Sequence, residues 1–139
     1  MKKINTLDII NPINQLNLYG YNFYFDLFIK LFEGVKIPST ILLNGTKGLG
    51  KSTFIYHFIN YICSKNEDEK YNISQKRINE NNRSYKLVNE NIHPNFFSLS
   101  TSAEKKEIKV DETRRLLSFL NKSTYSLGKK YVLIDSADK

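Results

Sequence analysis

The sequence predicts a three-layer α/β fold, in which a parallel sheet carries helices on both faces. Three observations lead to this prediction. Apolar runs of strand length alternate along the chain with segments of helical periodicity. A glycine-rich turn joins one of these runs to a helix, and the last run, Tyr131–Ile134, is apolar without a break. Such a run is typical of a central strand in a parallel sheet, because both faces of the strand are buried.

The composition indicates one globular domain that spans residues 1–139. The chain is 40% hydrophobic and 25% charged, which suffices for one core. Its formal net charge of +7 suits a nucleic-acid or nucleotide partner, or reflects a general lysine bias, because the lysines are scattered. Cys63 is the single cysteine, and we expect it in the core of a cytoplasmic protein. No apolar run in the sequence is long enough to span a membrane.

The first half of the chain predicts a helix, a strand and a helix around the glycine-rich turn. Residues 21–33 carry apolar side chains at helical spacing, and Gly34 is a plausible end for that helix. Thr40–Leu43 is expected to be a strand next to Tyr131–Ile134 in the sheet. Residues 54–62 again have helical spacing. The two stripes expected to face the core consist of Phe25, Phe28, Ile29, Phe32, Phe54, Ile55, Phe58, Ile59 and Ile62.

The second half predicts a long polar connection and then strand, helix and strand. Residues 66–91 are rich in Asn, Glu, Lys, Ser and Arg, so we expect a polar surface excursion with one helical piece around residues 74–81. Phe96–Leu99 is a short buried strand. The next helix begins at Val110, with Asp111 as its N-cap. The side chains expected on its apolar face are Thr113, Leu116, Leu117 and Leu120.

The glycine-rich turn carries the strongest functional signal. Residues 45–52 match G-x-x-x-x-G-K-[ST], the phosphate-binding P-loop, between the strand and the helix that the motif requires. Glycines let backbone N–H groups surround the phosphates, Lys51 would reach the β- and γ-phosphates, and Ser52 would ligate Mg²⁺. The alternative is a Gly/Lys-rich surface turn before a helix. The residues expected to bind ATP are Gly45, Thr46, Lys47, Gly48, Leu49, Gly50, Lys51, Ser52, Thr53 and Asp135.

Asp135 supplies the second half of this expected site. An apolar strand that ends in Asp is the Walker B pattern, and we expect Asp135 to hold Mg²⁺ together with Ser52. The alternative is an N-cap for a following helix. Ser136 stands where many P-loop ATPases have a water-activating Glu. Asp138 is the one candidate substitute for that Glu, but it lies three residues beyond Asp135. We therefore predict no catalytic residue in this chain, and slow or absent hydrolysis.

Four segments between Gly20 and Lys139 give the chain a resemblance to a known family. It resembles the N-terminal ATPase-type domain of bacterial DNA polymerase III delta-prime subunits, which are clamp-loader components of the AAA+ superfamily. Ser136 and Asp138 are more similar to delta-prime than to the related gamma/tau subunits, which usually have Asp-Glu-x-His at this point. The four segments are residues 20–45 up to the P-loop, the His-Pro turn and strand at 92–97, the helix entry at 108–116, and the Walker B segment at 132–139.

The resemblance implies a P-loop NTPase fold of the AAA+ type, truncated after the Walker B strand. It also implies that the chain binds ATP with Mg²⁺ and helps to load the sliding clamp onto DNA during replication. The partners would be other clamp-loader subunits in a hetero-oligomeric ring, the sliding clamp, and primer-template DNA through the complex. The family's four-cysteine zinc module is missing, so no zinc is expected. Arg114 and Arg115 would face a neighbouring subunit or DNA, or form a solvated helix face.

Two alternatives remain open at this point. One is a gamma/tau-type clamp-loader ATPase. The other is a stand-alone P-loop NTPase or kinase, which would need a complete catalytic set and a site for its substrate. His57 and His93 are weak candidates for such a set, because His57 falls beside Phe58 on an apolar helix and His93 precedes a proline in a turn.

Overall fold

The computed structural model describes residues 10–100, 109–123 and 128–135. Its elements alternate between helices and strands in the second half of the chain, as the sequence predicts. In chain order they are the 3₁₀ helix η1 (Pro12–Asn14), α1 (Asn22–Glu33), α2 (Lys51–Cys63), α3 (Arg83–Asn89), β1 (Phe96–Ser100), α4 (Val110–Asn121) and β2 (Tyr131–Asp135).

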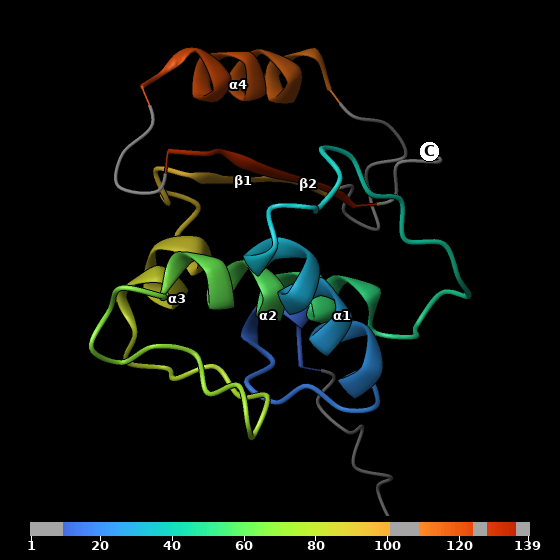
Figure 1. Cartoon of the computed structure of the whole chain (residues 1–139). Helices are drawn as coiled ribbons and strands as arrows, with labels where there is room; N and C mark the ends of the chain where they lie inside the picture. Colours follow the sequence, from blue (N-terminus) through green and yellow to red (C-terminus); the bar gives the residue numbers. More distant parts are fainter. Residues whose placement is uncertain (1–9, 101–108, 124–127, 136–139) are drawn as a thin grey trace, which may run out of the picture.

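The described strands form a parallel two-stranded sheet between two layers of helix. β1 pairs with β2 in a register that sets Phe96 against Tyr131 and Ser100 against Asp135. Figure 1 shows α4 on one face of this sheet and α1, α2 and α3 on the other. Successive side chains of β1 point to opposite faces of the sheet. Phe96 packs with α2, while the ring of Phe97 lies 5.4 Å from that of Phe119 on α4. The predicted α/β class, with helices on both faces of a parallel sheet, is confirmed.

An aromatic cluster holds α1 against α2 and forms the main core. Phe25 at its centre is 0% exposed, and its ring centroid lies 6.0 Å from Phe54 and 6.3 Å from Phe58. Both contacts are edge-to-face, an arrangement that adds to the stabilisation from burial alone. The predicted stripes on the two helices therefore do meet in the core.

A second, smaller cluster joins α2 and α3 to the sheet. Ile59 and Cys63 of α2 pack there with Val88 and Phe96, and Tyr131 and Leu133 of β2 cover the cluster. Burial raises the pKa of the Cys63 thiol to about 12, so the thiol stays protonated at neutral pH. The prediction that Cys63 is a core residue is confirmed.

The expected strand at Thr40–Leu43 is wrong. This segment is not a strand in the structure, Leu42 is 81% exposed, and of its four residues only Leu43 packs against the main core. The physical reason is that a strand exists through backbone hydrogen bonds to a neighbour, and within the described residues β2 is hydrogen-bonded to β1 and to no other strand. Leu133, on the paired strand, is half-buried.

Residues 66–91 are not only a polar surface excursion. Tyr71, Ile78 and Val88 are buried, and the first two belong to the main core. The helical piece is α3 at 83–89 rather than around 74–81. The side chain of Asn82 decides this boundary, because it accepts a hydrogen bond from the Tyr85 N–H at 2.6 Å and so caps the helix that follows.

Two expectations for α4 are also corrected. Its N-cap is Lys109, and Asp111 lies inside the first turn, where its negative charge still favours the helix dipole. Phe119 is the buried residue of this helix, whereas Leu117 and Leu120 of the expected face are exposed. The apolar side chains of α4 share one half of the helix, and the large ring of Phe119 at the edge of that half fills the contact with Phe97.

Candidate nucleotide-binding site

The glycine-rich loop leads directly into the N-terminus of α2. Gly48 has φ +87° and Gly50 has φ +79°, both in the left-handed region that side chains other than glycine rarely adopt. Gly50 is the N-cap of α2, which begins at Lys51. The glycines of the motif therefore stand where the backbone must turn, and the free N–H groups of the first helical turn lie beside the loop. Such an arrangement favours an anion.

Lys51 lies over the loop that precedes it. Its Nζ donates hydrogen bonds to the carbonyl oxygens of Gly45, at 2.6 Å, and Thr46, at 2.9 Å. The ammonium group is thus held at the first residues of the motif, although its sequence position is at the end. A phosphate bound by the loop would meet a positive charge already oriented toward the loop.

Ser52 and Asp135 come together from opposite ends of the described chain. Ser52 Oγ donates a hydrogen bond of 2.9 Å to Asp135 Oδ2, across 83 positions of sequence. Parallel pairing of β2 with β1 carries Asp135 to the carboxyl edge of the sheet, next to the first turn of α2. The two oxygens that the sequence predicts as Mg²⁺ ligands therefore face each other.

This pair fits a magnesium ion by its chemistry and spacing. Mg²⁺ prefers oxygen ligands in octahedral geometry with bonds of ~2.1 Å, so neighbouring ligands in that octahedron are about 3 Å apart. The 2.9 Å between Ser52 Oγ and Asp135 Oδ2 is the length of the hydrogen bond that joins them, and it leaves both oxygens close enough to reach one ion. A hydroxyl and a carboxylate would hold the ion while leaving room for phosphate oxygens and water.

The other expected site residues lie along the loop or outside the described chain. Thr46, Lys47 and Leu49 are exposed, and Thr53 is half-buried in the first turn of α2. Ser136 and Asp138 lie outside the described residues, as does any helix that Asp135 would cap. Arg114 and Arg115 are both exposed on α4.

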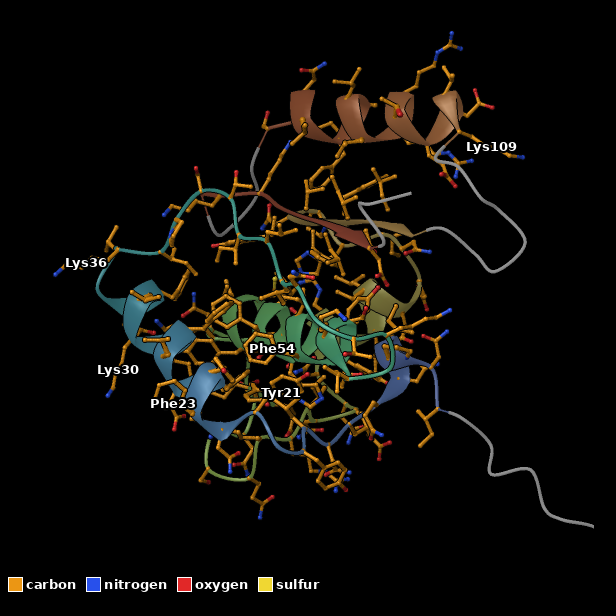
Figure 2. All side chains as sticks on the ribbon, turned by 90° about the vertical axis from the view of Figure 1, so that its right-hand side faces the viewer. Tyr21, Phe23, Lys30, Lys36, Phe54 and Lys109 are labelled. Carbon is orange, nitrogen blue, oxygen red and sulfur yellow. The ribbon has the colours of Figure 1, made fainter. Side chains whose placement is uncertain are left out.

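Tyr21 is a site residue that the sequence analysis missed. Its hydroxyl donates a hydrogen bond to the backbone carbonyl of Leu49, in the middle of the loop. Its ring packs against Phe54 at 5.3 Å between centroids, and Figure 2 shows the two side chains beside each other. The sequence carried no signal for this contact, because no spacing rule connects Tyr21 to a loop 28 positions away.

Tyr56 is a second missed residue close to the candidate metal ligands. It lies one helical turn beyond Ser52, and its hydroxyl is 3.2 Å from Ser98 Oγ on β1. Burial raises the pKa of Tyr56 above its ordinary value, and the negative charge of Asp135 raises it further, while the hydrogen bond to Ser98 opposes both. Tyr56 therefore stays neutral at neutral pH and links α2 to the sheet below the site.

Neither histidine is placed for catalysis. His57 is fully buried, its Nε2 donates to the Gln15 carbonyl at 2.8 Å, and its Nδ1 accepts from the Tyr71 hydroxyl at 2.9 Å. Burial lowers the pKa of His57 to about 4. His93 is also buried, and its Nδ1 accepts from the N–H of Asn95 at 3.1 Å. Both imidazoles act as structural groups within the described chain.

No group of three or more His, Cys, Asp or Glu side chains in the described residues is arranged to hold a metal ion. The helices in the same part of the chain are all too short or too polar to cross a lipid bilayer.

The chain matches a family model over most of its length. The model is described as DNA polymerase III, delta subunit, and it matches residues 21–139, which include the glycine-rich loop and β2. No curated protein and no solved structure matches the chain significantly. Because the match covers more than half of the sequence, the chain belongs to the DNA polymerase III delta subunit family.

Proposed function

We propose that this chain is a delta-prime-like subunit of the DNA polymerase III clamp loader that binds Mg-ATP at residues 45–53 and Asp135. Family membership supports a clamp-loader-related role. The delta-prime assignment and the ATP site go further than the family match, and they rest on the residues of the loop and of the Walker B strand.

One observation carries the nucleotide site, namely the pairing of Ser52 with Asp135 at 2.9 Å. A surface turn rich in Gly and Lys would have no reason to meet a carboxylate from the end of a strand of the sheet. The left-handed glycines and the ammonium of Lys51 over the loop agree with the same proposal. Together they provide a backbone cradle, a point charge and two metal ligands for a nucleoside triphosphate.

Hydrolysis by this chain alone is proposed to be slow or absent. Ser136 follows the Walker B aspartate where a carboxylate base would be needed, and a hydroxyl cannot act as that base at neutral pH. No arginine of this sequence is identified as a finger that would stabilise the γ-phosphate. A missing finger costs about 10³–10⁵ in rate, so other subunits would have to supply such groups.

In the cell, the proposed partners are other clamp-loader subunits in a hetero-oligomeric ring, together with the sliding clamp and primer-template DNA. This places the proposed function in the cytoplasm, in replication. The exposed arginines of α4 offer positive charge to such a neighbour or to DNA. Co-purification of the chain with the other clamp-loader subunits tests this part directly.

The nucleotide site is tested by titration calorimetry with Mg-ATP. Lys51→Ala should weaken binding by at least about tenfold, because it removes a charge-assisted hydrogen bond to phosphate. Lys36→Ala is the matched control, since it removes the same charge from an exposed position that lies before the loop and outside the motif. Equal affinity of wild type and Lys51→Ala would show that the loop is not a P-loop in function.

The same proteins separate the proposal from the stand-alone enzyme. A clamp-loader subunit of the proposed kind should show no steady turnover of ATP by itself. Turnover by the isolated chain that Lys51→Ala abolishes would instead indicate a stand-alone NTPase. Ser136→Glu supplies the missing base next to Asp135, and a rise in turnover in the presence of partner subunits would support the role assigned to Ser136.

A further inference from the structure

Tyr21 ties the start of α1 to the centre of the glycine-rich loop. The hydroxyl donates to the Leu49 carbonyl, while the ring contacts Phe54, which is buried in the main core. A Cβ added to Gly50 would lie 3.7 Å from the Tyr21 ring, so the ring also covers this glycine. One side chain thus connects the rigid aromatic core with the backbone of the candidate phosphate loop.

The acceptor of this hydrogen bond belongs to the peptide between Leu49 and Gly50. In a trans peptide the C=O and the N–H point in opposite directions across one rigid plane. When Tyr21 holds the Leu49 carbonyl on its own side, the Gly50 N–H must point away from Tyr21. One of the two bonds about which this peptide rotates belongs to Gly50, which is in the left-handed region and has no side chain to restrict it.

We propose that Tyr21 is a positioning residue that fixes the Leu49–Gly50 peptide so that its N–H is available to a bound phosphate. The inference rests on the proposed function, because it assigns Tyr21 a part in the same site. Tyr21 does not touch the phosphates but sets the orientation of a donor that does. The class of ligand is any polyphosphate, since the effect acts on the loop and not on the base or the sugar.

The hydroxyl and the ring of Tyr21 make separable contributions. Tyr21→Phe keeps the ring contact with Phe54 and removes only the donor to Leu49. Tyr24→Phe is the matched control, because Tyr24 lies in the first turn of α1 with an exposed side chain, and its hydroxyl makes no hydrogen bond within the described residues. Neither change should shift the thermal unfolding midpoint of the protein by more than about 2 °C.

The first measurement is affinity for two probes, Mg-ATP and inorganic tripolyphosphate. Tyr21→Phe should weaken both by the same factor of about three to ten, because part of the cost of ordering the peptide would then be met on binding, and Tyr24→Phe should weaken neither. Wild-type affinity of Tyr21→Phe for both probes would overturn the proposal. A loss for ATP alone would also overturn it, because Tyr21 would then act on the base or the sugar.

The second measurement needs no nucleotide and separates this proposal from the proposed function. Backbone ¹⁵N order parameters of residues 48–50 should fall in Tyr21→Phe from the rigid range near ~0.85 toward ~0.6, and should stay unchanged in Tyr24→Phe. Unchanged order parameters in Tyr21→Phe would overturn the proposal. If the order parameters fall while the wild type binds neither probe, the effect of Tyr21 on the loop is supported and the proposed function is wrong.

Discussion

On one face of the sheet, α1 and α2 interlock through a cluster of aromatic rings, whereas α4 rests on the other face mainly through Phe119. Phe25 contacts the rings of Phe54 and Phe58, and further apolar side chains close the cluster around it. On the α4 face, the rings of Phe97 and Phe119 meet, while Val132 and Ile134 of β2 stay partly exposed. Most of the free energy of unfolding should therefore come from the layer formed by α1 and α2.

This difference bears on the candidate nucleotide site. Lys51 and Ser52 are the first residues of α2, and the loop runs directly into them. This part of the site therefore belongs to the densely packed layer. Asp135 comes from β2, whose outward face is covered by less protein. The loop and the more loosely held carboxylate of Asp135 meet at Ser52, so changes on the α4 face should reach the candidate site through Asp135.

The largest effect is expected from Phe25→Ala, which removes the centre of the packed layer. We expect a loss of about 3–5 kcal/mol in the free energy of unfolding, because the large cavity cannot collapse among rings that pack on one another. Phe23→Ala on the same helix is the control, since Phe23 is 73% exposed and should change stability by less than about 0.5 kcal/mol. Urea unfolding measures both, and similar losses would show that the two sides of α1 do not differ as described.

Acid should weaken the same layer through His57. Its pKa is about 4 in the folded protein and 6.5 in an unfolded chain, so the unfolded state takes up its proton first as the pH falls. Stability is complete above pH 6.5 and is lost progressively toward pH 4. At ~1.4 kcal/mol for each pKa unit, the total loss is about 3 kcal/mol.

Urea unfolding between pH 7.5 and 4 measures this slope, and His57→Gln should make it shallower. Part of the slope will persist in that variant, because burial also lowers the pKa of His93. Titration of the His57 ring by NMR provides an independent check. A ring that titrates near 6.5 in the folded protein would contradict the burial of this group.

A smaller loss is expected from Phe119→Ala on the α4 face. We expect about 2 kcal/mol, less than for Phe25, because Phe119 has one aromatic partner in the described part of the chain and lies beside exposed positions. Leu117→Ala is the control, since Leu117 is 54% exposed and should cost below about 1 kcal/mol. Hydrogen exchange should accelerate in α4 of the Phe119 variant before it does in α2. Equal acceleration in both helices would mean that the layers open together.

The smallest effect is expected at Leu42, and it tests whether the segment at residues 40–43 belongs to the packed layer. Leu42→Ser should change the free energy of unfolding by less than about 0.5 kcal/mol, because the side chain is exposed and its segment is not a strand. Leu43→Ser should cost more, since Leu43 packs against the main core. A loss above about 2 kcal/mol for Leu42 would restore the central strand that the sequence predicts.

The sequence by itself determined the elements whose patterns are local. The stripes of α1 and α2 and the apolar runs of β1 and β2 follow from side-chain periods of one turn or one pleat, so they could be read without any partner. The loop glycines were equally predictable, because their backbone angles are a property of the turn. The α/β class followed from the order of these elements.

The tertiary structure alone decided the features that depend on distant partners. Thr40–Leu43 has a strand-like sequence but no neighbouring strand within the described residues. Helix α4 buries Phe119 against Phe97, although its leucines were equally apolar candidates for burial. The bonds of Tyr21 to Leu49 and of Ser52 to Asp135 join residues 28 and 83 positions apart. Periodicity describes which side of an element is apolar, but only packing decides what that side meets.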